Sequence, residues 1–246
     1  MTRIMVTAAA AATALCAVAT TGCAVRPNGK EAHATRTFPH SGTQLTITSS
    51  GGGLRILPGT AGAVRVDRWS RGKAAAEGNA SWSLEDGTLR LSADCAIVFG
   101  DCAARYRVRV PPGVRLVVHG SDDGVVLRDL AQDVNVSSAG PIRAYGTSGR
   151  LRLLGDDSLI AGDHLRSPTA DVRTSTGPIN LSFATPPSRL NIRSRDGRVT
   201  AIVPPGPYQV TATSTHGRAR SQLKSTGSDR TIVVRSTSGD VRIKEK

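Results

Sequence analysis

One short phrase recurs along this chain: an apolar residue, then Ser or Thr two positions later, then Gly three positions after that. The copies span residues 47–52, 172–177, 192–197, 212–217 and 234–239, and a degenerate copy spans 135–140. Gly177, Gly197, Gly217 and Gly239 are separated by 20, 20 and 22 residues. Self-similarity at this period is typical of stacked repeat folds, because one unit cannot bury its apolar face alone. The phrase therefore predicts coils that cover one another.

Apolar and polar residues alternate on both sides of the repeat glycines. After Gly177, for example, Ile179 and Leu181 alternate with Asn180 and Ser182. Alternation with a period of two places the two kinds of side chain on opposite faces of a strand. Each repeat is therefore predicted to be a strand, a glycine-centred turn and a second strand. We expect the glycine to supply the positive φ that such turns need.

These patterns predict an all-β fold, a β-solenoid of stacked short strands resembling a β-helix. Beyond the first 25 residues no stretch shows a helical stripe, and aromatic residues make up 3% of the chain, so Val, Ile, Leu and Ala must fill the core. A β-sandwich or barrel is the alternative, since it also has short strands at regular spacing. The predicted strands cover residues 44–49, 53–57, 63–69, 81–84, 88–93, 105–110, 114–119, 125–128, 134–137, 141–144, 151–153, 172–175, 179–183, 189–194, 198–203, 208–213, 218–223, 231–236 and 240–244.

The N-terminus has the features of an export signal. Residues 4–25 carry no charge, follow a short basic start and contain the sequence Thr20-Thr21-Gly22-Cys23. An apolar run of this kind is typical of a secretory signal. Gly followed by Cys resembles the lipobox of bacterial lipoproteins, in which the cysteine is lipidated and becomes the mature N-terminus. Thr20 departs from that pattern, because Leu is usual at its position.

This interpretation divides the chain into three parts. We expect a lipoprotein-type signal peptide over 1–22, a flexible tether over 23–42 that begins with lipidated Cys23, and a β-repeat domain over 43–246. Two alternatives remain open. The uncharged stretch of 22 residues is long enough to cross a bilayer as an uncleaved helix, at about 1.5 Å per residue. Cleavage after Ala34 would instead release a secreted protein. All three interpretations place the β domain outside the cytoplasm.

The remaining cysteines indicate a disulfide. Cys16 lies in the predicted signal peptide and Cys23 at the lipidation point, which leaves Cys95 and Cys102. In an oxidising exterior such a pair is most simply a disulfide. It would close a loop with the apolar centre Ile97-Val98-Phe99 and contribute about 2.5 kcal/mol in the chain-entropy model. We expect a structural bond, since the spacing is not that of a Cys-x-x-Cys redox or metal motif.

The chain is strongly basic, with a formal net charge of +13 carried by 27 Arg and 5 Lys. In residues 105–110 arginine alternates with other residues, so we expect the arginines to face solvent and the core to receive Tyr106, Val108 and Val110. Such a row can attract anionic envelope polymers or lipid headgroups. Evenly spread arginine would instead reflect a GC-rich genome and protect sheet edges. We do not expect a nucleic-acid partner, because the aromatic residues on which bases stack are scarce.

No motif in the chain predicts catalysis, a cofactor or a metal. The P-loop, the nucleophile elbow and the dinucleotide fingerprint do not occur. The carboxylate pairs Asp122-Asp123 and Asp156-Asp157, with Asp163 nearby, lie beside Gly, and adjacent residues of a strand point to opposite faces. They are predicted to form turns rather than to flank one glycosidic bond. The histidines are scattered without metal-ligand spacing, at His33, His40, His119, His164 and His216.

Two phrases in the C-terminal run from Phe183 to Lys246 are moderately specific: Pro205-Gly206-Pro207-Tyr208 and Ser238-Gly239-Asp240-Val241. With the repeats around them, they resemble the bacterial "putative adhesin" family, a domain of unknown function built from repeats of roughly 20 residues. The resemblance is weaker over 43–150. It implies a β-helical, non-enzymatic, envelope-associated domain without catalytic residues. The Thr-Gly-Cys signal resembles that of actinobacterial lipoproteins.

Together these observations predict a non-enzymatic, lipid-anchored protein on the outer face of the cell membrane. It would present an extended β-repeat surface for adhesion or envelope interaction. Its expected partners are the membrane, through the anchor, and anionic envelope polymers or an unidentified protein. Two other classes remain as alternatives: a sensor or accessory domain of an envelope-stress system, and an envelope polysaccharide-active enzyme in which Asp123 or Asp157 assists.

Overall fold

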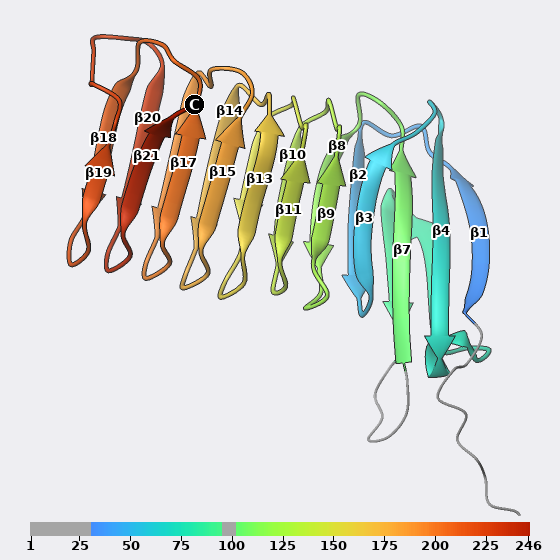
Figure 1. Ribbon diagram of the computed structural model, residues 1–246. Coiled ribbons are helices and arrows are strands. Elements are labelled where there is room, and N and C mark those ends of the chain that lie inside the picture. The colour runs from blue at the N-terminus through green and yellow to red at the C-terminus, as the bar shows by residue number, and fades with distance from the viewer. Residues whose placement is uncertain (1–30, 95–101) are drawn as a thin grey trace, which may run out of the picture.

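The computed structural model describes residues 31–94 and 102–246 of the chain. In this part, strands form two long sheets, A and B, and the helical structure is one short 3₁₀ turn, η1 (Lys73–Ala75). The strands stand side by side along a rod-shaped body (Figure 1). The all-β, solenoid-like fold expected from the repeats is confirmed.

Sheet A has eleven strands. Their order across the sheet is β1 (Ala32–Pro39), β4 (Ala63–Gly72), β7 (Cys102–Val110), β3 (Gly53–Pro58), β9 (Val125–Arg128), β11 (Ile142–Tyr145), β13 (Ile160–Leu165), β15 (Ile179–Phe183), β17 (Val199–Val203), β21 (Val241–Glu245) and β19 (Ala219–Ser221). Sheet B has ten strands. Their order is β18 (Gln209–Ser214), β20 (Thr231–Ser236), β16 (Arg189–Ser194), β14 (Thr169–Thr174), β12 (Leu151–Leu154), β10 (Val134–Ser138), β8 (Arg115–Gly120), β2 (Gln44–Ser50), β6 (Thr88–Ala93) and β5 (Ala80–Glu85).

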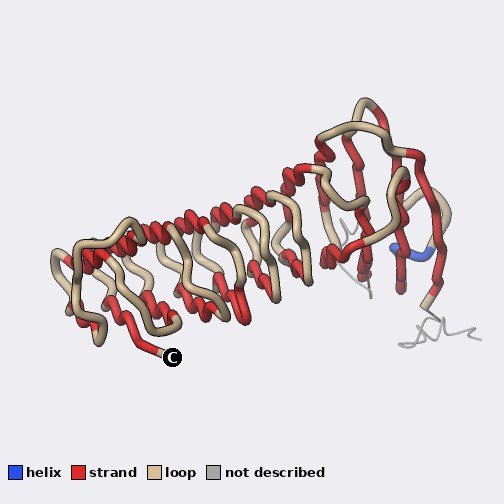
Figure 2. Tube along the Cα trace, turned by 90° about the horizontal axis from the view of Figure 1, so that it is seen from above, coloured by secondary structure: helices blue, strands red, loops and turns tan. Residues whose placement is uncertain are grey.

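From β8 onward the chain winds as a solenoid in which each coil contributes one strand to each sheet. β14 pairs in parallel with β12 and β16, and β15 pairs in the same way with β13 and β17. The coils follow one another along the rod (Figure 2). Their inner faces meet in a core of aliphatic side chains, among them the fully buried Val172, Ile179 and Ile192. Alternation with a period of two gives each coil this apolar lining.

Antiparallel strands extend both sheets at the N-terminal end of the rod. β4 pairs in antiparallel fashion with β1 and β7, and β5 pairs with β6. Residues 32–39, expected to belong to the flexible tether, form β1. Alternation of apolar and polar residues does not predict this strand, because Phe38 is its one buried side chain. Cleavage after Ala34, one of the alternatives above, would therefore cut within a strand.

A second strand, β13, lies in a stretch where the sequence predicts none. Its pairing with β15 shifts register between Gly162 and Leu165, and His164 there has a φ of 51°. This β-bulge adds one residue, so that Leu165 rather than His164 faces the core. The extra residue breaks the alternation on which the prediction depends.

The glycines of the later repeats are required for close stacking and not, as expected, for positive φ, whereas Gly52 of the first copy has the expected positive φ of 96°. Gly177, Gly197 and Gly239 are not among the glycines with positive φ. A Cβ on Gly197 would instead clash with the carbonyl oxygen of Gly177, and a Cβ on Gly239 with that of Gly197. The turns of successive coils therefore stack so closely, in what we call the glycine ladder, that these positions have no room for a side chain larger than the hydrogen of glycine.

The Ser or Thr of the phrase is buried beside this ladder. Ser194 Oγ donates to the carbonyl of Gly197 at 3.0 Å, and Ser236 Oγ accepts from the amide of Gly239 at 2.9 Å. Both serines are buried. A buried backbone group without a partner is costly, so the hydroxyl satisfies the turn where the next coil excludes water.

The last two coils do not stack in sequence order. β20 and β21 lie between β16–β17 and β18–β19, so the coil of residues 209–221 ends the rod. The inserted coil has a strongly apolar lining of Ile232, Val234, Val241 and Ile243. The end coil places smaller residues inward, and β19 is exposed throughout. The coil with the smaller inward side chains therefore lies at the end of the rod, where it contacts one neighbouring coil instead of two.

Candidate functional site

The outer face of sheet A carries a concentration of arginines at its N-terminal end. On β7 the arginines alternate with Tyr106, Val108 and Val110, which are buried, as the sequence predicts. Neighbouring strands add further arginines in register with them. We call this set the arginine face: Arg55, Arg65, Arg105, Arg107, Arg109, Arg128 and Arg143.

The arginine face does not continue along the rod. In the register row that contains Arg55 and Arg143, the next strands of sheet A carry Ala161, Asn180 and Thr200, and arginine returns only at the far end, as Arg242 and Arg220. A second group of opposed arginines, Arg173, Arg193 and Arg235, lies on the outer face of sheet B. The arginines of the rod therefore gather in local groups, of which the arginine face is one.

Asp67 neutralises one side of the arginine face. Its carboxylate accepts hydrogen bonds from Thr35 Oγ1 at 2.8 Å and Arg109 Nη1 at 2.7 Å, and Arg65 Nη2 lies 3.4 Å away. Burial of the carboxylate opposes its ionisation, but the Thr35 and Arg109 hydrogen bonds and the nearby positive charges outweigh burial and hold the pKa of Asp67 below its usual value. Arg65 and Arg109 are therefore already paired.

Arg55 and Arg107 lack such a partner. They lie directly opposite each other on β3 and β7, and in the described part of the chain neither forms an ion pair. Like charges directly opposite each other destabilise a sheet. Arg107 is held instead by the aromatic ring of Trp69, with its Cζ 4.8 Å from the ring centroid, and Trp69 also stacks on His33.

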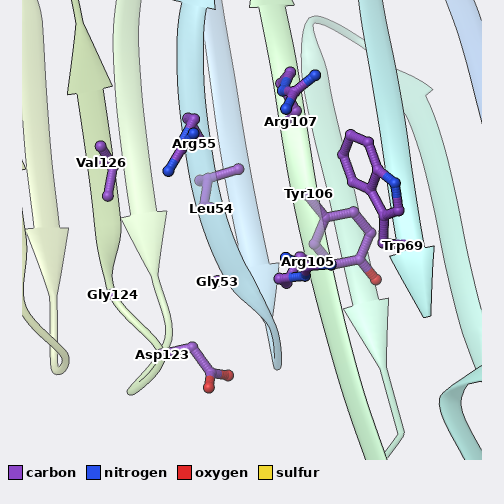
Figure 3. A pocket seen from close by; sticks show the side chains of 10 residues that line it. All are labelled: Gly53, Leu54, Arg55, Trp69, Arg105, Tyr106, Arg107, Asp123, Gly124 and Val126. Atoms are coloured by element: carbon purple, nitrogen blue, oxygen red, sulfur yellow. The ribbon is translucent and has the colours of Figure 1, made fainter. Parts of the chain in front are cut away.

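An open hollow of about 390 Å³ lies over these residues. Figure 3 shows Arg55 on β3 between Val126 of β9 and Arg107 of β7, with Arg105 farther along β7 and Trp69 on the next strand, β4. We call this the arginine hollow. Arg105, at its edge, pairs with Glu31 at 2.5 Å. The lining thus combines two unpaired guanidinium groups with an apolar surface.

Asp123 lies at the rim of the arginine hollow, in the turn before β9. Its Oδ2 accepts the amide of Gly52 at 2.7 Å, so it fixes one turn against another. The carbonyl oxygen of Asp156 likewise accepts the amide of Gly177, and Asp163 contacts His164. Asp122-Asp123 and Asp156-Asp157 thus lie in turns and bends, as predicted, whereas Asp163 lies within strand β13.

The predicted covalent sites lie largely outside the described residues. Cys23 and Cys95 fall in the segments 1–30 and 95–101, as do the signal peptide and the possible membrane helix. Cys102 begins β7. Lipidation of Cys23 and the Cys95–Cys102 disulfide therefore stay predictions. Over residues 31–94 and 102–246, no helix is long and apolar enough to span a membrane, and no cluster of His, Cys, Asp and Glu could hold a metal ion.

The sequence pattern does not predict that Arg55, Trp69 and Arg143 lie near the arginine row on β7. β3 and β7 are separated by three strands in the sequence but pair in the sheet. The alternation of apolar and polar residues in 53–58 and 63–72 does predict that Arg55 and Trp69 face outward. The sequence does not predict the pairing register of β3 and β4 with β7, which brings these side chains together.

No family model matches this chain, and no curated protein matches it. It is similar to solved structures named putative adhesins from Bacteroides fragilis, with 15% identity, TM-score 0.46 and coverage of 89% of this chain and 99% of that one. A putative adhesin from Parabacteroides merdae has 12% identity, TM-score 0.47 and coverages of 87% and 96%. A putative cell adhesion protein from Clostridium sporogenes has 11% identity, TM-score 0.37 and coverages of 88% and 100%. These similarities are too low to support a conclusion about the function of this chain.

Proposed function

We propose that this chain is a non-enzymatic, lipid-anchored protein at the outer face of the cell membrane, of the "putative adhesin" kind and with an actinobacterial-type lipoprotein signal. Its β-solenoid makes adhesive contacts with anionic material of the cell envelope. The observation that carries the proposal is the arginine face, with its opposed and unpaired Arg55 and Arg107. Such clustered charge raises the local concentration of anionic partners and their rate of association.

The short tether supports a role close to the membrane. With lipid on Cys23, the eight residues to Glu31 reach at most about 30 Å when fully extended. Glu31 contacts Arg105, so the arginine face lies at the anchored end of the rod. Anionic polymers at the membrane surface are within its reach.

Cell fractionation tests the anchor. The wild-type protein is expected in the membrane fraction with a lipid-modified mass, because acylation transfers apolar chains into the bilayer. Cys23→Ala is expected to be released or to accumulate as an unprocessed precursor. Unchanged membrane retention together with an unchanged mature mass would refute lipidation at Cys23.

Sedimentation with isolated envelopes tests the contact. Full-length protein in detergent is expected to co-sediment at low salt and to be released as the salt concentration rises, since salt screens exposed charges over about 10 Å at 0.1 M. Absence of co-sedimentation at low salt would refute the proposed function.

A further inference from the structure

We infer that the arginine hollow is a binding site for the carboxylate groups of an acidic polysaccharide, with Arg55 and Arg107 as the groups that hold the carboxylate. This inference deepens the proposed function and rests on it. Arginine presents paired N–H donors that match the two oxygens of a carboxylate. Arg55 and Arg107 have these donors free of any acidic partner in the described chain.

The arginine hollow already holds a carboxylate at its edge. Glu31, the first described residue, places Oε2 against Arg105 Nη2 at 2.5 Å, and both side chains are exposed. Asp67 lies directly opposite Arg107 on β4 and is bound by Arg109, two positions farther along β7. Carboxylates are thus the partners that this face takes within the protein, and Glu31 competes for the site.

The order of side chains along the rod also favours a polysaccharide. The register row reads Arg107, Arg55, Val126 and Arg143 on β7, β3, β9 and β11. Arg55 and Arg143 are therefore two strands apart, about 10 Å between their Cα atoms, and half-buried Val126 lies between them. Each unit of an acidic sugar polymer carries apolar C–H surface beside its carboxylate, and this surface can cover Val126. A polyphosphate unit has no such surface.

Trp69 and His33 have a role in positioning Arg107. Trp69 lies within cation–π distance of Arg107 and stacks on His33 at 4.7 Å between ring centroids. These contacts restrict the Arg107 side chain, so less conformational entropy is lost when a carboxylate binds. Trp69 is therefore a positioning residue for Arg107.

Binding of the full-length protein in detergent to polygalacturonate tests the inference. The double variant Arg55→Gln/Arg107→Gln is expected to weaken binding about tenfold or more, since hydrogen bonds to charged groups are among the strong ones. The matched control is Arg193→Gln/Arg235→Gln, which removes two arginines that also lie directly opposite each other, on the outer face of sheet B. It is expected to change binding less than about threefold, through net charge alone.

A second pair of variants works in the opposite direction. Glu31→Gln removes the internal competitor and is expected to strengthen binding severalfold. Glu85→Gln removes an equal charge beside Arg90 at the edge of sheet B and is expected to have a much smaller effect. Thermal unfolding of each variant checks that it is folded. If the Arg107 change impairs folding, Arg55→Gln alone carries the test, because Arg55 makes no ion pair in the described chain.

Three results would overturn the inference. An equal loss from the two double variants would show that binding follows net charge, and it would leave the envelope contact itself standing. Tighter binding to long-chain polyphosphate or to phosphatidylglycerol vesicles than to polygalacturonate would assign the hollow to phosphate groups. No binding to polygalacturonate, together with intact sedimentation on envelopes, would also overturn it without refuting the proposed function.

Discussion

The glycine ladder can be tested at its centre by Gly197→Ala. The new Cβ would lie 2.7 Å from the carbonyl carbon of Gly177 and 2.9 Å from the carbonyl oxygen of Thr176. Both atoms are backbone of the preceding coil, so no side chain can rotate away. The two coils must separate locally, or the turn must change its conformation.

The cost follows from overpacking. Extra methyl groups forced into packed regions cost about 1–3 kcal/mol. Ala in place of Gly recovers about 0.4–1 kcal/mol from the unfolded chain. A clash with backbone places the substitution at the upper end, for a net loss of about 2 kcal/mol. For a domain of this length that corresponds to a fall in Tm of about 4–8 °C.

Gly227→Ala is the matched control, because a Cβ added there would have no atom within 4 Å and the φ of Gly227 is not positive. Urea and thermal unfolding of the two variants, followed by circular dichroism, should separate them clearly. Equal stability of Gly197→Ala and Gly227→Ala would refute the argument that close coil contact demands glycine.

Three further predictions concern individual contacts. Ser236→Ala should cost about 1 kcal/mol, since it leaves the Gly239 amide without its buried acceptor, and urea unfolding against Ser228→Ala measures it. Asp67→Asn should destabilise the protein at neutral pH, and the difference from wild type should shrink below about pH 4. The pKa of Asp67 is lower in the folded protein than in the unfolded chain, so the ionised carboxylate stabilises the fold at neutral pH and this stabilisation is lost as the carboxylate is protonated. An equal difference in unfolding free energy at pH 3 and pH 6 would contradict this. Burial raises the pKa of Tyr106 to about 12, so wild-type stability should fall between pH 10 and 12 as the unfolded phenol ionises first, and Tyr106→Phe should reduce that fall.

The sequence predicts the coils well and the site poorly, for physical reasons. Alternation in residues 105–110 and 179–183 reports which side chains face the core, because that pattern is local. β13 escapes prediction because its bulge places Leu165 out of phase. The arginine hollow escapes because it depends on pairing between β3 and β7, and a pairing register between strands distant in the sequence is not written in either strand alone.

The inserted position of β20 and β21 has a consequence for how the molecule is completed. When the chain is synthesised from its N-terminus, the coils can stack in sequence order as far as β17. Residues 209–221 are then synthesised before β20 and β21, the strands with which they pair in the finished fold. Residues 209–221 either stay unpaired until residues 231–245 have folded, or pair first with β16 and β17 and are then displaced by β20 and β21. A product truncated before β20 would therefore leave its terminal strands without their native support and open to proteases.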